Sequence, residues 1–241
     1  MPDVTTVITL CEESLMPDPM GALFWAREET LIVSDLHFEK GSSFAGRGVM
    51  LPPYDTRTTL KRLAALIRKY KPKRLISLGD AFHDRDAEGR MEDDDARMLE
   101  GLLSQTEWLW ILGNHDPEPS VRFAAATETE AQIGPLIFRH EPLARPAPGE
   151  VAGHLHPCAR VAAEGRLLRR RCFAVGAASD NQRLVMPAIG AYTGGLNVLD
   201  PAYASLFDNV TAWVMGEHGV YPISEDRLAP NAKSAARKRA G

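Results

Sequence analysis

The sequence has no long apolar run. Among its 241 residues, no stretch approaches the roughly 18 consecutive apolar residues that a membrane-spanning helix needs. The first residues, MPDVTTVITLCEESL, also lack the basic start and the long apolar stretch of a secretory signal. We therefore expect a cytoplasmic protein.

Cysteine is scarce, with only Cys11, Cys158 and Cys172. Their number is odd and no two are spaced as CxxC, so the sequence indicates neither a disulfide framework nor a thiolate zinc site. We expect reduced thiols. Cys158 stands two residues after His156, and we interpret it as a small packed side chain rather than a metal ligand.

An excess of positive charge is absent as well. The chain has 28 basic and 32 acidic residues and a formal net charge of −4, so general positive charge would not hold it on nucleic acid. An anionic partner would need a local site. Two basic clusters exist, RLLRRR at 166–171 and NAKSAARKRAG at 231–241. For the first, two interpretations stay open: an exposed strand edge protected by arginine, or a phosphate-binding segment.

What the sequence does have is enough apolar residues, 44%, to bury a core. We expect a single domain at residues 1–225 and a basic, disordered tail at 226–241, because the tail has no apolar stripe. Apolar residues recur at helical spacing in 54–70 and 91–105, which predicts two helices lying on a sheet.

Short β-branched or aromatic runs alternate with these helices. We expect strands at 31–35, 74–80, 108–114 and 136–140 in a mainly parallel sheet. After residue 150 the helical period disappears, and strand-like runs follow at 151–154, 171–176, 183–190, 196–200 and 210–215. The pattern predicts an α/β fold of two packed mixed sheets flanked by helices.

The histidines are the main functional signal. Six of the seven stand at or just after the end of a predicted strand, beside Asp, Asn or Gly: His37, His83, His115, His140, His154 and His156. Ligands of α/β sheets bind beyond the carboxyl ends of strands, where several loops converge. Alone, each such residue is ordinary turn chemistry or a structural histidine. Together they offer more imidazole, carboxylate and amide ligands than one metal needs, which indicates two ions of Mn²⁺, Fe or Zn²⁺.

The spacing of the first pair fits this interpretation. Alternate side chains point the same way as a strand ends, so we expect Asp35 and His37 to reach one ion. The adjacent Leu36 would point to the other side.

Five blocks of the sequence resemble the signature of calcineurin-like metallophosphoesterases over residues 31–157: D35-x-H37, G79-D80, G113-N114-H115-D116, H140 and G153-H154-x-H156. The resemblance implies a β-sandwich with αββα layers. It implies one metal ion bound by Asp35, His37, Asp80 and His156. The second ion would be bound by Asp80, Asn114, His140 and His154, so that Asp80 bridges the pair.

The same resemblance implies a mechanism. Two cations about 3.5 to 4 Å apart would hold a bridging hydroxide for in-line attack on phosphorus, and His115 would act as the catalytic residue on the leaving-group side. Many relatives carry an Asp that orients this histidine where the present chain has His83. We expect Asp84 or a water to orient His115 instead.

Several further stretches, DLHFEKGSSFAGRG, LPPYDT, FRHEP and MPAIGAYTGGLNV, resemble a bacterial subgroup described as ligase-associated DNA damage response endonucleases. This resemblance runs from about residue 20 to about 222. It implies Mn²⁺-dependent phosphodiester cleavage and a functional association with an ATP-dependent DNA ligase and a DEAD/DEAH-type helicase.

Substrate contacts are expected in the loop 38–54. There, Lys40 and Arg47 would hold a phosphate and Phe44 would stack on a base; a plain surface loop is the alternative. We interpret 186–195 as a segment that closes the second sheet, with a substrate-facing wall as the alternative.

Three functions remain open. The first is a dinuclear phosphodiesterase acting as a DNA endonuclease in repair. The second is a hydrolase of small nucleotides or other phosphoesters, which the acidic net charge of −4 keeps open. The third is a non-catalytic binding module on the same fold, which the intact ligand set disfavours.

Overall fold

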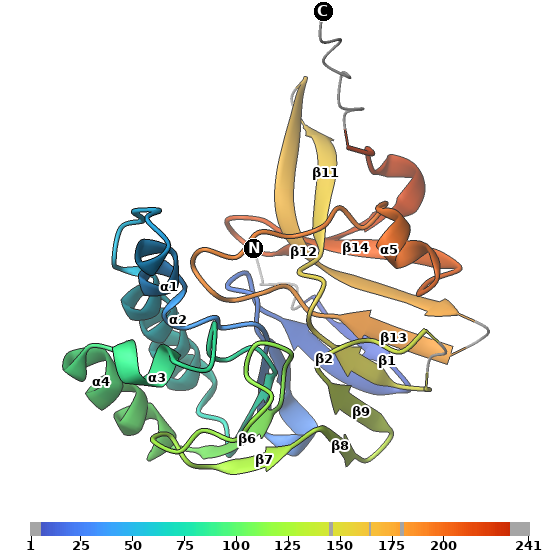
Figure 1. Ribbon diagram of the computed structural model, residues 1–241. Coiled ribbons are helices and arrows are strands. Elements are labelled where there is room, and N and C mark those ends of the chain that lie inside the picture. The colour runs from blue at the N-terminus through green and yellow to red at the C-terminus, as the bar shows by residue number, and fades with distance from the viewer. Residues whose placement is uncertain (1–5, 145–146, 164, 179–180, 232–241) are drawn as a thin grey trace, which may run out of the picture.

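Two β-sheets packed face to face form the body of the structure, a computed structural model that describes residues 6–144, 147–163, 165–178 and 181–231 (Figure 1). The first sheet has the order β1-β2-β3-β4-β5-β6-β7. Its strands are β1 (Ile8–Leu10), β2 (Glu13–Pro17), β3 (Leu23–Trp25), β4 (Thr30–Val33), β5 (Arg74–Leu78), β6 (Glu107–Ile111) and β7 (Ala126–Glu128). Strands β4 to β7 run parallel, which confirms the parallel order predicted for 31–35, 74–80 and 108–114. The antiparallel strands β1 to β3 were not predicted from the sequence.

The second sheet has the order β15-β14-β12-β13-β10-β9-β8, and β11 pairs with β12 outside this path. Its strands are β8 (Glu130–Ile133), β9 (Leu136–Arg139), β10 (Glu150–Ala152), β11 (Cys158–Ala163), β12 (Arg166–Ala178), β13 (Asn181–Val185), β14 (Asn209–Met215) and β15 (Val220–Ser224). Most neighbours are antiparallel, but β10 runs parallel to both β9 and β13. The sheet is therefore mixed, as expected.

Helices cover the outer faces of both sheets. They are α1 (Lys40–Gly46), α2 (Asp55–Tyr70), α3 (Ala87–Arg90), α4 (Asp93–Leu103) and α5 (Pro201–Ala204), with the 3₁₀ turns η1 (Ala26–Glu28) and η2 (Glu225–Arg227). Helices α2 and α4 confirm the two predicted helices. No helix among the described residues is long and apolar enough to span a membrane.

Alternation along the strands explains how one sheet serves two cores. In β4, Leu31 and Val33 pack under the helices, whereas Ile32 faces the second sheet and joins a core with Phe138 and Phe173. Successive side chains of a strand point to opposite faces, so a strand covered on both sides is apolar throughout. A third cluster lies between the second sheet and α5. The expected two packed sheets with flanking helices are confirmed.

Some boundaries differ from the predictions. Residues 196–200 do not form a strand; within them only Asn197 makes an isolated bridge, to Cys158. The predicted strand at 136–140 is β9, which belongs to the second sheet. Residues 40–46 of the predicted loop form α1.

The chain remains in contact with the second sheet beyond the predicted boundary at residue 225. Leu228 forms an isolated bridge with Val161, and the N–H of Ala229 donates to the carbonyl of Arg160 at 2.8 Å. The first part of the predicted disordered tail, 226–231, therefore packs against the sheet. The remainder, 232–241, lies outside the described residues.

Candidate metal centre

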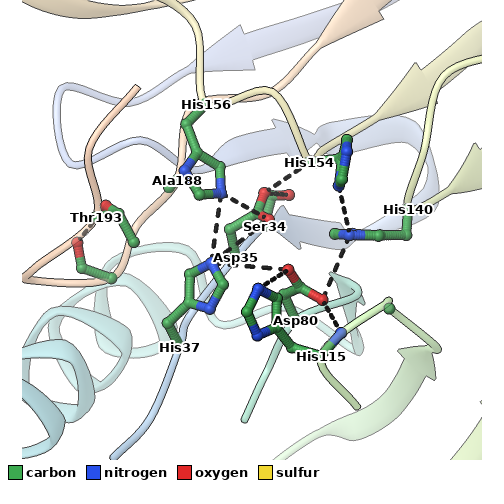
Figure 2. Close-up of polar contacts among 12 residues, drawn as sticks. Ser34, Asp35, His37, Asp80, His115, His140, His154, His156, Ala188 and Thr193 are labelled. Atoms are coloured by element: carbon green, nitrogen blue, oxygen red, sulfur yellow. Dashed lines mark hydrogen bonds and ion pairs between the residues drawn. The ribbon is translucent and has the colours of Figure 1, made fainter. Parts of the chain in front are cut away.

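Loops that follow five strands of the two sheets bring the predicted ligands together (Figure 2). Asp35 and His37 follow β4, Asp80 follows β5, Asn114 and His115 follow β6, His140 follows β9, and His154 and His156 follow β10. Strands of both sheets contribute, so the packing of one sheet on the other assembles the site. Sites of this kind are typical beyond the carboxyl ends of parallel strands.

The described side chains form three groups of potential metal ligands, of which two consist of predicted ligands and the third joins His37 to His83 and His115. Asp35, His37 and His156 make one group. His156 Nε2 lies 3.4 Å from His37 Nε2 and 2.9 Å from Asp35 Oδ1. Asp80, His140 and His154 make the other. Within each group, one ligand atom per residue lies within 4.8 Å of the others.

Asp80 lies between the two groups. Its Oδ2 is 3.7 Å from His37 Nε2, and its Oδ1 is 3.4 Å from His140 Nε2. The residue is buried, with 2% of its surface exposed, so water does not solvate its charge. One buried carboxylate thus directs one oxygen toward each group.

The hydrogen bonds of His140 test whether a cation fits. Its Nδ1 lies 2.9 Å from the carbonyl of Leu78, which can only accept, so Nδ1 carries the proton and a neutral ring leaves Nε2 with a lone pair. Yet Nε2 faces Asn114 Oδ1 at 2.9 Å and His154 Nδ1 at 3.2 Å. The lone pairs of His140 Nε2 and Asn114 Oδ1 therefore face each other, an arrangement that fits a shared cation.

Burial of His37 leads to the same conclusion. It lowers the pKa of His37 to about 2, so the imidazole is neutral at physiological pH and has a lone pair to donate to a metal. Desolvation of the charged ring is the physical cause. The neutral ring and the two converging groups fit a pair of divalent ions.

The backbone around the ligands differs from the strand continuation expected from sequence. Strand β4 ends at Val33, and Asp35 and His37 lie beyond it with left-handed φ values of 52° and 45°. Asp80 and His156 are also left-handed, each with φ 48°. Such values are uncommon outside glycine and persist where the surrounding structure holds them. The alternation of a strand was therefore the wrong explanation for the pair, although both side chains do reach one group.

Two glycines of the sequence blocks are required by close packing. A Cβ on Gly79 would lie 2.4 Å from Nδ1 of His140, and one on Gly153 would lie 2.0 Å from Oγ of Ser34 and 2.7 Å from Oδ2 of Asp35. These contacts are too short for any side chain. The glycines let the β5 and β10 loops approach the ligands.

Asp116 organises the site, a role that was not predicted from the sequence. Its carboxylate accepts hydrogen bonds from the backbone N–H groups of Asp80, Ala81 and Phe82 at 2.7 to 3.1 Å and from Gly113 at 3.0 Å. Burial and the neighbouring Asp80 carboxylate raise the pKa of Asp116 to about 6, although the backbone N–H groups act in the opposite direction. Asp116 joins the β5 loop to the β6 loop. Its position as the last residue of GNHD was the available signal.

His115 is oriented by a backbone carbonyl. Its Nδ1 lies 2.7 Å from the carbonyl oxygen of His83, and its N–H donates to Asp80 Oδ1 at 3.0 Å. The two imidazole rings stack with centroids 5.0 Å apart, and burial, with Lys40 next, lowers the pKa of His83 to about 4. The Asp84 carboxylate instead accepts from Arg90 at 2.8 Å. Of the two groups expected to orient His115, Asp84 or a water, Asp84 is bound to Arg90, and the His83 carbonyl contacts Nδ1 of His115 instead.

Helix α1 brings the expected substrate contacts to one side of the site. Phe44 stacks on His83 with centroids 6.0 Å apart. Burial lowers the pKa of Lys40, while the Asp80 and Asp35 carboxylates act in the opposite direction. Arg47 is exposed at the end of the helix. Of these three side chains, Lys40 is the one that interacts with the carboxylates of the centre.

Residues at the start of α2 hold α1 in place. The Asp55 carboxylate accepts from the N–H of Gly41 at 2.8 Å, and Thr56 Oγ1 accepts from the N–H of Glu39 at 2.8 Å. Neither side chain caps α2. They tie the segment that follows His37 to the helix beside it.

Known proteins resemble this chain in sequence and in fold. A model of the calcineurin-like phosphoesterase family matches residues 29–165, a range that contains both ligand groups. A search of curated proteins found no match. Among solved structures, Pseudomonas putida nuclease MPE is similar at 27% identity with a TM-score of 0.68, over 90% of this chain and 99% of that one. Yfce, a phosphoesterase from E. coli, has 12% identity and a TM-score of 0.41, over 81% and 98% of the two chains.

Proposed function

The chain belongs to the calcineurin-like phosphoesterase family, and from this premise we infer that it is a dinuclear phosphodiesterase that cleaves DNA as an endonuclease. It is a metal-dependent phosphoesterase. The observation that carries the dinuclear assignment is Asp80, a buried carboxylate that directs one oxygen toward each of two ligand groups. The similarity to a nuclease over 90% of the chain supports a nucleic-acid substrate, and the choice of DNA rests on the subgroup resemblance.

In this proposal the two ligand groups are completed by Asp80 and Asn114. Asp35, His37, Asp80 and His156 hold one ion, and Asp80, Asn114, His140 and His154 hold the other. When bound, two divalent cations polarise phosphoryl oxygens and lower the pKa of water. Imidazole with carboxylate and amide oxygen suits Mn²⁺, and Fe or Zn²⁺ are the alternatives.

His115 acts on the leaving group. Its Nδ1–H remains on the His83 carbonyl, so a protonated ring carries its transferable proton on Nε2, the nitrogen 3.9 Å from Asp80 Oδ2. Transfer of that proton to the departing oxygen leaves a neutral ring with the same hydrogen bond to His83.

The proposal also includes a biological role and a location for the protein. A role in DNA repair with an ATP-dependent ligase and a DEAD/DEAH-type helicase rests on the subgroup resemblance alone. A cytoplasmic location is part of the proposal and rests on the sequence, whose three cysteines show no CxxC spacing. The main alternative, hydrolysis of small nucleotides or other phosphoesters, is favoured by the net charge of −4.

One experiment separates these functions. Metal-stripped protein is restored with Mn²⁺ and assayed on bis(p-nitrophenyl) phosphate, p-nitrophenyl phosphate and supercoiled plasmid, with Asp80→Ala and His115→Ala as controls. Nicking of the plasmid by the native chain, abolished in Asp80→Ala, is the expected result. Turnover of p-nitrophenyl phosphate alone would eliminate the DNA substrate. No Mn²⁺-dependent turnover of any substrate would favour the binding module.

A further inference from the structure

Strands β11 and β12 form a hairpin that projects beyond the rest of the second sheet (Figure 1). Residues 158–163 pair with residues 166–171, whereas β13 and β14 pair with β12 only from Cys172 onward. The outer half of β12 thus has one strand partner in the described structure. Its side chains point outward from a two-stranded ribbon.

The hairpin is strongly basic. Between residues 158 and 171 it carries Arg160, Arg166, Arg169, Arg170 and Arg171, against one acidic residue, Glu164. Cross-strand partners share a face, so Arg160 and Arg169, which are paired, lie on one face. Arg166 and Arg170 lie on the other, because side chains alternate along a strand. Both faces of the ribbon are therefore positive.

These charges are not neutralised by the hydrogen bonds that the arginines make. Arg160 donates to the carbonyl of Pro230 at 2.8 Å and Arg170 to that of Arg169 at 3.3 Å. Carbonyls are uncharged acceptors. The side chains of Arg166, Arg169 and Arg170 are exposed, so most of their N–H donors face solvent. The chain as a whole is acidic, which makes this surface a local exception.

The base of the hairpin contacts the segment beside the metal centre. Arg169 donates to the carbonyl of Gly195, and a Cβ on Gly195 would lie 2.2 Å from the carbonyl oxygen of His156. One residue therefore separates Arg169 from a proposed metal ligand. The positive ribbon begins at the edge of the site and extends away from it.

A second connection runs through Arg171. Its guanidinium donates to the carbonyls of Ala188 and Gly190, each at 3.0 Å. The N–H of Gly190 in turn donates to the carbonyl of Asp35 at 3.1 Å. Arg171 thus fixes the segment 186–195 against the Asp35 loop, beside the metal centre rather than only at the end of the second sheet.

We propose that the β11–β12 hairpin is an arginine arm, formed by Arg166, Arg169 and Arg170, that binds the phosphates of a DNA strand next to the bond being cleaved. This rests on the proposed function. Arg is well suited to phosphate because its planar group makes paired hydrogen bonds. A strand held at the metal centre continues past Gly195 onto the arm, where successive phosphates meet arginines on either face. A small phosphodiester is too short to reach them.

Binding of DNA tests the arm separately from cleavage. The triple variant Arg166→Gln, Arg169→Gln, Arg170→Gln is compared with Lys61→Gln, Arg68→Gln, Lys71→Gln, which removes the same charge from exposed positions on and after α2. The Mn²⁺-loaded full chains are titrated against a fluorescent single-stranded phosphorothioate oligonucleotide at several salt concentrations. Turnover of bis(p-nitrophenyl) phosphate reports whether the metal centre is intact.

The arm variant is expected to bind roughly tenfold more weakly. The slope of its salt dependence should fall by about 0.7 for each phosphate that the arm no longer binds, or about 2 for three phosphates. Turnover of the small diester stays within about twofold of the native rate. Because Arg169 touches Gly195, the double variant Arg166→Gln, Arg170→Gln repeats the test without disturbing that hydrogen bond; the slope should then fall by about 1.4.

Equal affinity and salt slope in the arm and control variants would overturn the arm, and so would a native chain that does not bind the oligonucleotide. The proposed function fails by a different observation. A native chain that binds the oligonucleotide through the arm but does not nick plasmid would support the proposed DNA-binding role of the arm and contradict the proposed endonuclease activity.

Discussion

The metal centre and the arginine arm carry charge in opposite ways. Asp35 and Asp80 are almost fully buried, and each meets imidazoles and backbone N–H groups from other loops. Arg166 and Arg170 are exposed on a ribbon with one strand partner along their stretch in the described structure. A buried charge without partners is costly, whereas an exposed one is solvated by water.

This difference separates chemistry from substrate choice. A ligand cannot be replaced without leaving its buried partners unpaired, so a change there should affect every substrate and often stability. An arm residue can be replaced with little effect on folding. Its replacement should affect only substrates long enough to reach it.

The largest effect should follow Asp80→Ala. Both ligand groups lose their shared carboxylate, and the electrostatic contribution of bound cations is worth several kcal/mol, so turnover of every phosphodiester should fall roughly 10⁴-fold. Steady-state assays on bis(p-nitrophenyl) phosphate and DNA check this. Asp93→Ala, on the exposed start of α4, is the control and should retain full activity. Retention of more than a tenth of the rate would rule out a bridging role.

A smaller and more selective loss is expected for His115→Ala. General acid catalysis contributes about 10²- to 10⁴-fold, but only where the leaving group needs a proton. Cleavage of DNA, which expels an alkoxide, should fall on the order of 10²-fold, while release of the acidic p-nitrophenol should change far less. Parallel losses on both substrates would assign His115 to positioning of the phosphate instead.

Asp116→Asn should act on the metals through the backbone. Asn offers one oxygen and an amide that donates, so one of the two N–H pairs, Ala81 with Phe82 or Asp80 with Gly113, loses its acceptor. Partners that orient ligands typically change metal affinity 10- to 100-fold, so the Mn²⁺ concentration for half-maximal activity should rise by that factor. At saturating Mn²⁺ the rate should recover. The matched Asp86→Asn, at an exposed position, should leave the titration unchanged, and an unshifted titration of Asp116→Asn would remove the proposed bracing role.

The proximity of the candidate ligands was partly accessible from the sequence through the order of the strands. Carboxyl ends of parallel strands meet at one edge, so the side chains placed after β4, β5 and β6 were expected to lie near one another. The loops after β9 and β10 belong to the second sheet and reach the same place through the packing of the two sheets. The structure brings Asp35, Asp80 and their histidines together as the spacing indicated. What the pattern could not give is the left-handed backbone at these positions, which depends on packing between loops.

Other features depend on tertiary contacts that no local pattern records. Helix α1, KGSSFAG, contains Gly41 and Gly46, and glycine disfavours helix. It forms because Asp55 and Thr56 hold its start. Asp116 gains its role only when the β6 loop meets the β5 loop. Residues 196–200 look like a strand but lack a continuous partner in the described structure, with one bridge at Asn197.

The smallest effect is expected for Arg47→Gln, which changes an exposed side chain on the substrate-binding surface and leaves the buried centre intact. Arg47 ends α1 and is exposed, yet its charge contributes to the lowered pKa of His83, which places it within electrostatic range of the site. A single phosphate contact at the surface should change the KM for DNA about threefold and reduce the salt slope by about 0.7, with kcat and melting temperature unchanged. Arg68→Gln, exposed on α2, is the matched control. If Arg47→Gln lowers kcat on the small diester and Arg68→Gln does not, the Arg47 guanidinium takes part in the chemical step. The division between a buried centre for chemistry and an exposed surface for substrate binding then does not apply at α1.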